Sequence, residues 1–215
     1  MKFSAAYLLL VVALNVALVK GEFPIPKREV GFVYGGGKAE APITVDLYID
    51  LLCSDSRPAL ATLRSVADHY GPNTLRLTTH LCPLPYKRNA FHAAMGAHVV
   101  HAVTNGSATF DWMSTVYDNM YSLSNYATFH MSEQDVFWRL TGLASEVGVS
   151  STQFIQGISG GSSSHDAKVA WKYCCTRGVA EVPAFMINDV TVLASQSWTL
   201  DDWRGVIDPL LDGRT

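Results

Sequence analysis

The chain has 215 residues, of which 48% are hydrophobic and 16% are charged, and its formal net charge is −3 at pH 7. This is the composition of an ordinary globular protein, so we expect no disorder beyond the chain ends. The slight negative charge excludes the strongly basic surface that binds nucleic acid.

The beginning of the chain has the pattern of a signal peptide. Lys2 precedes an apolar run over residues 5–14, Asn15 interrupts the run, and the small residue Gly21 stands at the expected cleavage point. We therefore predict a signal peptide over residues 1–21 that is later removed. A membrane anchor is the alternative, but it needs about 20 apolar residues. No second long apolar run follows, so we expect no membrane association after cleavage.

The C-terminal residues 212–215 do not form a retention signal for the endoplasmic reticulum. We therefore expect a secreted protein, with the lumen of the endoplasmic reticulum as the alternative location. Asn105 begins the sequon Asn-Gly-Ser, which predicts a glycoprotein with a surface loop at this position. Secretion would place the four cysteines in an oxidising compartment, where disulfides persist.

Strand patterns and one helix fill the first part of the chain. Residues 30–34 are typical of a short edge strand, and residues 43–51 alternate apolar side chains as a central strand does. A helix with apolar positions from Leu60 to Tyr70 follows, and then a second strand over residues 75–81. A strand-helix-strand unit of this length implies parallel pairing and a right-handed crossover.

Helical patterns dominate the middle of the chain. Helices are predicted over residues 91–103, 110–121, 133–147 and 164–175. A short turn is predicted near residues 152–157, within the same helical stretch. We expect the aromatic residues of this stretch to pack its core and not to line a ligand groove. They are Phe110, Trp112, Tyr117, Tyr121, Tyr126, Phe129, Phe137 and Trp138.

The last part of the chain returns to strands and ends in a helix. Two strands are predicted over residues 184–187 and 190–193, separated by a turn, and an amphipathic helix covers residues 200–211. The whole order of elements predicts a mixed α/β fold with a helical insertion. Histidines 92, 98 and 101 lie in one predicted helix without a further ligand on the same face, so we expect partly exposed residues and no metal site.

Cys53 stands between a strand and a helix. Backbone N–H groups and the helix dipole at this position favour a thiolate, which is a nucleophile. Arg57 would help this ionisation and Asp55 would oppose it, whereas Ser56 could donate a hydrogen bond to the sulfur. The alternative is a buried cysteine that fills a gap in the core.

A loop over residues 177–188 enters a strand at Pro183, where a missing N–H is tolerated. Together with the segment from Cys53 to Ser56 and the helical stretch 89–160, this loop resembles the thioredoxin-like proteins of the DsbA type. In that family a Cys-x-x-Cys motif follows the first central strand, a helical domain is inserted, and a cis-proline faces the active site. The resemblance covers about residues 28–213.

The resemblance implies a thioredoxin-like α/β fold with an inserted helical domain. The thioredoxin-like domain would consist of residues 22–88 and 161–215, and the helical domain of residues 89–160. Residues 83–91 also resemble the junction between strand and insertion in eukaryotic secreted relatives.

The resemblance also implies roles for single residues. Cys53 matches the attacking cysteine, and Pro183 matches the cis-proline, so the backbone of Val182 would pair with a substrate strand. The resolving cysteine is replaced by Ser56. The family often has a buried acid six residues before the attacking cysteine, but Leu47 occupies that position here. Asp46 and Asp50 have the opposite strand parity, so neither simply replaces it.

Without a resolving cysteine, a mixed disulfide at Cys53 must be released by another thiol. Glutathione, a second thiol of the substrate or another cysteine of the chain could supply it. Cys82 ends the neighbouring parallel strand at the same edge of the sheet, so a Cys53–Cys82 disulfide is one alternative. We favour a disulfide from Cys82 to Cys174 or Cys175, because the family keeps its first active-site cysteine reactive.

We therefore predict an enzyme, a secreted thiol-disulfide oxidoreductase or isomerase of monothiol type. Cys53 would be its nucleophile, Ser56 the partner of the thiolate, and Val182 with Pro183 the substrate platform. Its partners would be proteins or peptides that contain thiols or disulfides, with glutathione as a co-substrate and no tightly bound cofactor. Two alternatives stay open: a non-catalytic peptide-binding protein that keeps the groove beside Pro183, and a glutathione-binding or transferase-like protein.

Overall fold

The computed structural model of the chain describes residues 25–26 and 29–212. The predicted signal peptide therefore lies outside the described residues. Within them, no helix is both long enough and apolar enough to cross a membrane.

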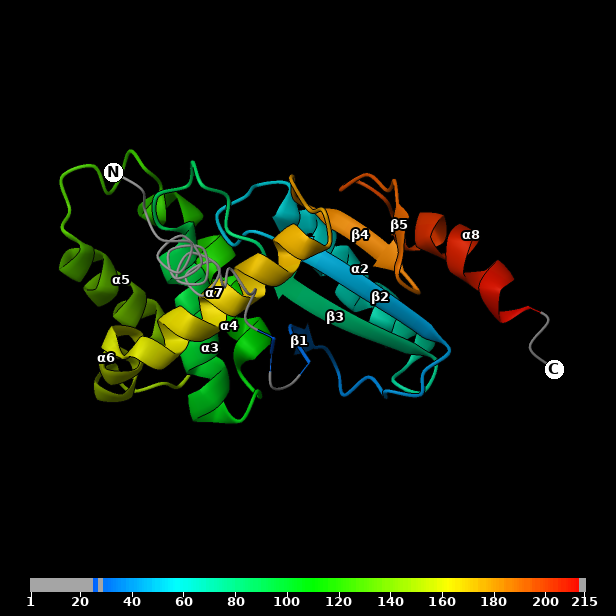
Figure 1. Cartoon of the computed structure of the whole chain (residues 1–215), viewed down its shortest axis with the longest axis horizontal. Coiled ribbons are helices and arrows are strands. Elements are labelled where there is room, and N and C mark those ends of the chain that lie inside the picture. Colours follow the sequence, from blue (N-terminus) through cyan, green and yellow to red (C-terminus); the bar gives the residue numbers. More distant parts are fainter. Residues whose placement is uncertain (1–24, 27–28, 213–215) are drawn as a thin grey trace, which may run out of the picture.

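A five-stranded sheet with the strand order β1-β3-β2-β4-β5 forms the centre of the molecule (Figure 1). Its strands are β1 (Phe32–Val33), β2 (Ile43–Ile49), β3 (Leu75–Leu81), β4 (Ala184–Ile187) and β5 (Val190–Val192). Strand β2 occupies the middle, parallel to β3 and antiparallel to β4. The predicted central strand, its parallel neighbour and the edge strand before them are thereby confirmed.

Seven α-helices and one 3-10 helix accompany the sheet in the described part of the chain. They are α2 (Ser56–Tyr70), α3 (Ala90–Thr104), α4 (Thr109–Asp118), η1 (Met120–Leu123), α5 (Glu133–Glu146), α6 (Ser151–Ser159), α7 (Gly161–Thr176) and α8 (Leu200–Leu211). The short turn that we predicted near residues 152–157, within the helical stretch, is part of the longer helix α6. Ser150 and Gln153 form a capping box that starts this helix.

The helices α3 to α6 gather beside one end of the sheet, whereas α8 lies at the opposite end (Figure 1). Helix α2 packs against β3 and α8, and α7 packs against both β3 and the helices α3 and α6. The chain thus has a mixed α/β fold with a helical insertion between β3 and α7, as predicted. The exact domain boundaries stay a prediction.

The core contains fewer aromatic side chains than we expected. Trp112, Tyr117 and Phe137 are buried as predicted, and the Trp112 indole donates to the carbonyl oxygen of Ala93 at 3.2 Å. The core prediction is wrong for four others, which expose more than half of their surface: Tyr121, Tyr126, Phe129 and Trp138. The first three of these lie between α4 and α5, where the chain has little regular structure.

A tight hairpin joins β4 to β5. Asn188 and Asp189 have φ values of 47° and 66°, and two successive residues in this left-handed region are typical of the turn that suits the twist of a hairpin. The Asn188 side chain accepts a hydrogen bond from the Thr44 N–H at 2.8 Å. The turn thereby holds β4 in register beside the central strand.

Candidate functional site

Cys53 lies in the short turn that connects β2 to α2. Its N–H donates to the carbonyl oxygen of Asp50 at 3.0 Å, and helix α2 begins three residues later, at Ser56. The sulfur is nearly buried, with 9% of the residue exposed. The free N–H groups of the first helical turn therefore lie directly after Cys53, where they favour negative charge.

The sulfur of Cys53 meets the loop that enters β4. Its Sγ donates to the carbonyl oxygen of Val182 at 3.7 Å, and the Val182–Pro183 peptide bond is cis. Val182 and Pro183 are both half-buried. The fold thus brings Cys53 together with Val182, which is 129 residues away in the sequence, and with Pro183 next to Val182.

Ser56 is fully buried at the first position of α2. Its hydroxyl oxygen accepts a hydrogen bond from the Asp50 N–H at 3.4 Å. No hydrogen bond joins the Ser56 hydroxyl to the Cys53 sulfur among the residues that the structure describes. Ser56 is therefore placed beside the turn of Cys53, and its role as a partner of the thiolate stays a prediction.

Asp50 is a buried acid beside this turn, and sequence reasoning did not assign it a role. Its carboxylate accepts the N–H of Leu52 at 2.6 Å and the N–H of Leu84 at 2.7 Å. Burial raises the pKa of Asp50 above its ordinary value, and the two backbone hydrogen bonds and Lys87 oppose this rise. A period-two strand pattern could not have found it, because Asp50 follows the last residue of β2.

Tyr117 of α4 reaches the same turn from the helical insertion. Its hydroxyl donates to the Asp50 carbonyl oxygen at 3.1 Å. Burial raises the pKa of Tyr117 well above its ordinary value, and the charges of Asp50 and Cys53 raise it further. The phenol therefore stays neutral and acts as a donor. The only sign of this contact in the sequence is an aromatic residue in a predicted helix.

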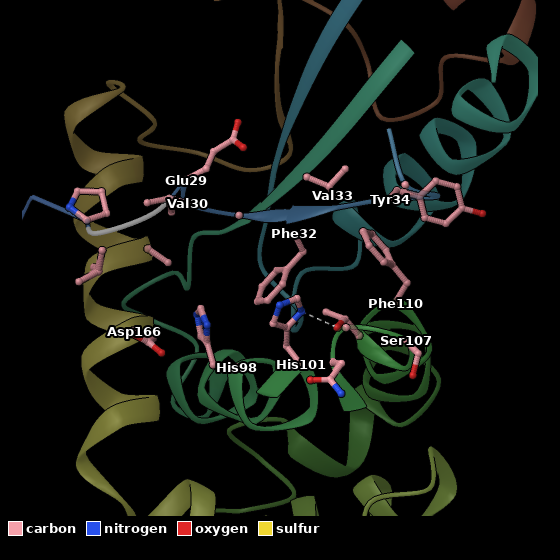
Figure 2. A pocket seen from close by; sticks show the side chains of 18 of the residues that line it. Glu29, Val30, Phe32, Val33, Tyr34, His98, His101, Ser107, Phe110 and Asp166 are labelled. Atoms are coloured by element: carbon pink, nitrogen blue, oxygen red, sulfur yellow. Dashed lines mark hydrogen bonds between the residues drawn. The ribbon is translucent and has the colours of Figure 1, made fainter. Parts of the chain in front are cut away.

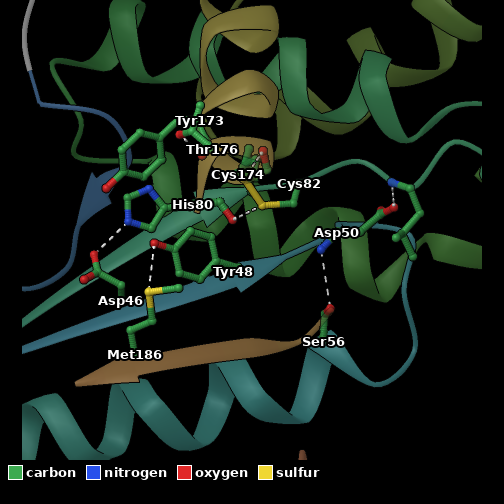
Figure 3. Close-up of a disulfide and its surroundings, with 12 residues drawn as sticks. Asp46, Tyr48, Asp50, Ser56, His80, Cys82, Tyr173, Cys174, Thr176 and Met186 are labelled. Carbon is green, nitrogen blue, oxygen red and sulfur yellow. Dashed lines mark hydrogen bonds and ion pairs between the residues drawn. A yellow bond between two sulfur atoms is a disulfide. The ribbon is translucent and has the colours of Figure 1, made fainter. Parts of the chain in front are cut away.

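A disulfide joins Cys82, directly after β3, to Cys174 in the last turn of α7 (Figure 3). The two Cα atoms are 6.0 Å apart, within the usual range for a disulfide. This is one of the pairings that the sequence left open, so the predicted disulfide is confirmed and the Cys53–Cys82 alternative is not formed. Cys53 and Cys175 are free thiols, the first buried and the second exposed.

A polar cluster lies on the face of the sheet next to the disulfide (Figure 3). The His80 ring stacks on Tyr48 at 4.7 Å and on Tyr173 at 5.1 Å, and its Nε2 lies 2.8 Å from a carboxylate oxygen of Asp46. Burial is the main cause that raises the pKa of Tyr48. The pairing of Tyr48 with His80 follows from the parallel register of β2 and β3, which the sequence predicted only as a strand pair.

Exposed aromatic side chains lie in two segments, one directly after β3 and one between α4 and α5. Tyr86 exposes 65% of its surface, Tyr121 75%, Tyr126 82% and Phe129 72%. Asn125 donates to the carbonyl oxygen of Tyr86 at 2.9 Å, which joins the two segments.

A separate cavity of about 1250 Å³ lies between β1, α3 and α7 (Figure 2). Phe32, His98, His101, Phe110 and Asp166 are among its lining residues, and Cys53 is not. His98 and His101 are half-buried, in agreement with the prediction for these helix residues.

Asn105 is exposed at the C-terminal end of α3, with a left-handed φ of 50°. Ser107, the third residue of the sequon, is exposed as well. The sequon thus lies on the surface, and its glycosylation stays a prediction.

The strand order, the helical insertion and the cis-proline opposite a cysteine in the turn before a helix define a thioredoxin-like fold of the DsbA type. A family model described as thioredoxin matches residues 30–209, so the chain belongs to the thioredoxin family. No curated protein sequence matches the chain.

Solved structures from bacteria have the same fold. A candidate protein-disulfide isomerase from Pseudomonas syringae is similar with a TM-score of 0.72 and 16% identity, over 82% of this chain and 97% of that chain. The thiol-disulfide exchange protein α-DsbA2 from Wolbachia pipientis gives a TM-score of 0.63 at 13% identity, over 96% and 100% of the two chains. BdbD from Bacillus subtilis gives 0.64 at 12% identity, over 85% and 94%.

Proposed function

We propose that the protein is a thiol-disulfide oxidoreductase or isomerase that uses Cys53 as a single reactive thiol. The observation that carries this proposal is the contact between the Cys53 sulfur and Val182, next to the cis Val182–Pro183 bond. The Cys82–Cys174 disulfide supports it, because that pairing leaves Cys53 free. The N-terminus of α2 follows Cys53, and this position favours a nucleophilic thiolate.

The exchange would proceed in two steps. In the first, the Cys53 thiolate attacks one sulfur of a substrate disulfide, forms a mixed disulfide with it, and releases the other sulfur as a thiolate. In the second, an outside thiolate attacks the substrate sulfur of the mixed disulfide, forms a new disulfide with it, and releases Cys53 as a thiolate. Because Ser56 has no sulfur, we propose that glutathione or a second thiol of the substrate performs the second step. When the substrate supplies that thiol, the net reaction is an isomerisation without gain or loss of electrons.

The backbone of Val182 would hold the substrate. A polypeptide in extended conformation can pair with the main chain before a cis-proline, which places its sulfur beside Cys53. The Val182 carbonyl oxygen that now accepts the thiol proton would be available to the substrate once Cys53 is ionised. Binding of the substrate and loss of the thiol proton would therefore favour each other.

We propose that this exchange takes place outside the cytosol, after removal of residues 1–21. The apolar run after Lys2, the sequon at Asn105 and the Cys82–Cys174 disulfide all support this location. Proteins or peptides with exposed disulfides would be the substrates, and glutathione would be the co-substrate.

A peptide whose only cysteine carries glutathione tests the proposal. We would measure the release of the peptide thiol by mature protein in the presence of reduced glutathione. The matched variants are Cys53→Ser, which removes the proposed nucleophile, and Cys175→Ser, which removes the other free thiol. Turnover that survives in Cys175→Ser and disappears in Cys53→Ser supports the proposal. Equal rates with and without wild-type protein contradict it.

A non-catalytic peptide-binding protein is the second candidate. The exposed aromatic residues Tyr86, Tyr121, Tyr126 and Phe129 favour it, because they offer apolar side chains to a partner. The segment of Tyr86 is joined to Asp50, beside the turn of Cys53, through the Leu84 N–H, and Asn125 joins the second segment to Tyr86. Fluorescence anisotropy with a labelled unfolded polypeptide separates the two functions. Binding that is equal in wild type and in Cys53→Ser, without turnover in either, identifies the binding protein.

A further inference from the structure

Two acidic side chains flank the contact between Cys53 and Val182. Asp55 follows Cys53 by two residues, and Glu181 directly precedes Val182. Consecutive Cα atoms are about 3.8 Å apart, so the Cα atom of Asp55 lies within about 7.6 Å of that of Cys53. Both acidic residues are exposed. Each of the two segments that form the candidate site therefore carries a carboxylate beside the contact.

These two carboxylates have no partner of opposite charge. Within the described part of the chain, no ion pair includes Asp55 or Glu181. Asp55 stands at the N-cap of α2, but its side chain makes no capping hydrogen bond there. It accepts a hydrogen bond from the neighbouring Ser54 hydroxyl at 3.5 Å. Both negative charges are thus available to a bound molecule.

The cations of the same two segments are already paired. Arg57, in the first turn of α2, forms an ion pair with Asp118 at the end of α4. Arg177, at the start of the loop that enters β4, pairs with Asp189 at 2.9 Å. Each cation is balanced by a carboxylate from another segment. The turn of Cys53 and the loop of Val182 therefore keep an excess of negative charge.

Two further cations belong to the segment after β3, and both are held by other groups. Lys87 faces the carboxylate of Asp50. The Arg88 side chain is turned to the insertion, where it donates to the carbonyl oxygen of Met131 at 2.7 Å. The formal net charge of the chain, −3 at pH 7, adds a field of the same sign as the two free carboxylates.

We propose that the site selects cationic substrates, namely thiol- or disulfide-containing polypeptides that have Lys or Arg beside the reacting cysteine. The inference rests on the proposed function and names its substrate class. A substrate strand paired with Val182 advances by about 3.3 Å per residue, so side chains one or two residues from its cysteine come within reach of Asp55 and Glu181. Complementary charge raises the rate of encounter, and like charge lowers it.

A reaction of Cys53 that needs no turnover tests the inference. The probes are peptides with one cysteine bonded to thiopyridine and with Lys, Gln or Glu on both sides of that cysteine. The Cys53 thiolate forms a mixed disulfide with the peptide and releases thiopyridone, whose absorbance gives the rate. The Cys175→Ser background leaves Cys53 as the one free thiol, because Cys82 and Cys174 are bonded. Division by the rate of mercaptoethanol with the same peptide removes the intrinsic reactivity of each probe.

We expect the Lys peptide to react at least about fivefold faster than the Glu peptide at low ionic strength, with the Gln peptide between them. At about 1 M salt the screening length is about 3 Å, so the ratio should fall below about two. The double variant Asp55→Asn, Glu181→Gln should lower the ratio to the same level at low ionic strength. A change in the reactivity of Cys53 itself cancels in this ratio of two peptides.

The matched control removes two exposed acids elsewhere, in the double variant Glu40→Gln, Asp212→Asn. Glu40 precedes β2, whereas Cys53 follows it, and Asp212 follows α8, at the opposite end of the molecule from the insertion (Figure 1). This variant should keep the preference for the Lys peptide. A preference that falls equally in both double variants overturns the inference, because the net charge and not the site would then set it.

Equal rates for the Lys and Glu peptides, or an unchanged ratio in the double variant at the site, also overturn the inference. Thermal melting establishes that each variant is folded. If the double variant does not fold, the single variants Asp55→Asn and Glu181→Gln take its place, and each should lower the ratio by about half. Turnover of the glutathionylated peptide without a charge preference rejects the inference alone. A charge preference without turnover supports the inference and contradicts the proposed function, whereas a Cys53 that reacts with no peptide contradicts both.

Discussion

The sulfur of Cys53 lies 3.7 Å from the carbonyl oxygen of Val182, the residue before the cis-proline. The thiol thus has a hydrogen-bond acceptor when it is protonated, and it loses this bond when it ionises. A substrate that pairs with Val182 would compete for the same oxygen. In the proposed function, the contact would therefore join the protonation state of Cys53 to the occupation of the substrate site.

Restoring a second cysteine should convert the monothiol site into a dithiol site. In Ser56→Cys the new thiol would stand three residues after Cys53, where it can attack a mixed disulfide and release the substrate. We expect pre-oxidised Ser56→Cys, in which the two active-site sulfurs form the oxidising disulfide, to oxidise one equivalent of a model dithiol peptide without glutathione at least about tenfold faster than the wild type does. Ser56→Ala is the matched control, and it should leave this oxidation at the wild-type level.

Removal of the disulfide should lower the stability of the protein strongly. Cys82 and Cys174 are 92 residues apart, and the entropy of closing so long a loop predicts a loss of about 4 kcal/mol in the double variant Cys82→Ala, Cys174→Ala. Unfolding by urea at neutral pH measures this loss. Cys175→Ala should change the free energy of unfolding by less than about 0.5 kcal/mol, because Cys175 is exposed and unbonded.

A side chain at position 96 should destabilise the helical core, because the site has no room for it. A Cβ atom on Gly96 would lie 2.3 Å from the Trp112 ring, so we expect Gly96→Ala to destabilise the protein by about 2 kcal/mol. Gly142 is the matched control in α5, because a Cβ atom there meets nothing within 4 Å. Gly142→Ala should stabilise the protein by up to about 1 kcal/mol. Thermal melting of the two variants and the wild type measures both changes.

The free energy of unfolding should fall at mildly acidic pH because of His92. Burial lowers the pKa of His92 below its ordinary value of 6.5, although Glu133 partly offsets the effect. The unfolded chain then binds a proton more readily than the folded chain does. The stabilising contribution is therefore present above pH 6.5 and is lost as the pH falls through the lowered pKa.

Urea unfolding between pH 7 and pH 5 measures this dependence. His92→Gln should have a flatter profile than the wild type over that range, whereas His165→Gln should follow the wild type because His165 is exposed. Parallel profiles for wild type and His92→Gln would contradict the assignment to His92.

Expression in a eukaryotic secretory host should attach a glycan at Asn105. The asparagine is exposed at a helix end, so the transferase can reach it. Intact-mass measurement should show a loss of mass on treatment with a glycosidase, and Asn105→Gln should abolish that loss. The same spectra give the new N-terminus, which we expect at residue 22.

The elements that the sequence predicted well are those with strong periodicity. Strands β2 and β3 have apolar side chains at regular intervals, and the predicted bounds of α8 agree with the structure. Helix α6 was predicted only as a short turn, because only Phe154 and Ile158 are buried in it, too few to give a clear period. The four exposed aromatic residues were misassigned because composition says nothing about which segment of an insertion lies on the surface.

The site was predicted only where the family pattern marks it. Cys53, Val182 and Pro183 are brought together as expected, although they come from opposite ends of the sequence. Asp50 and Tyr117 were not recognised, because their roles depend on contacts with residues 34 and 67 positions away. Such contacts form only when the insertion has docked against the sheet.

The disulfide between Cys82 and Cys174 closes a covalent ring around the whole helical insertion, since helices α3 to α6 all lie between these two residues. A protease that cuts once inside this ring leaves a single molecule under non-reducing conditions. The two pieces separate only when the disulfide is reduced. The insertion can therefore be nicked without release of either half of the thioredoxin-like domain.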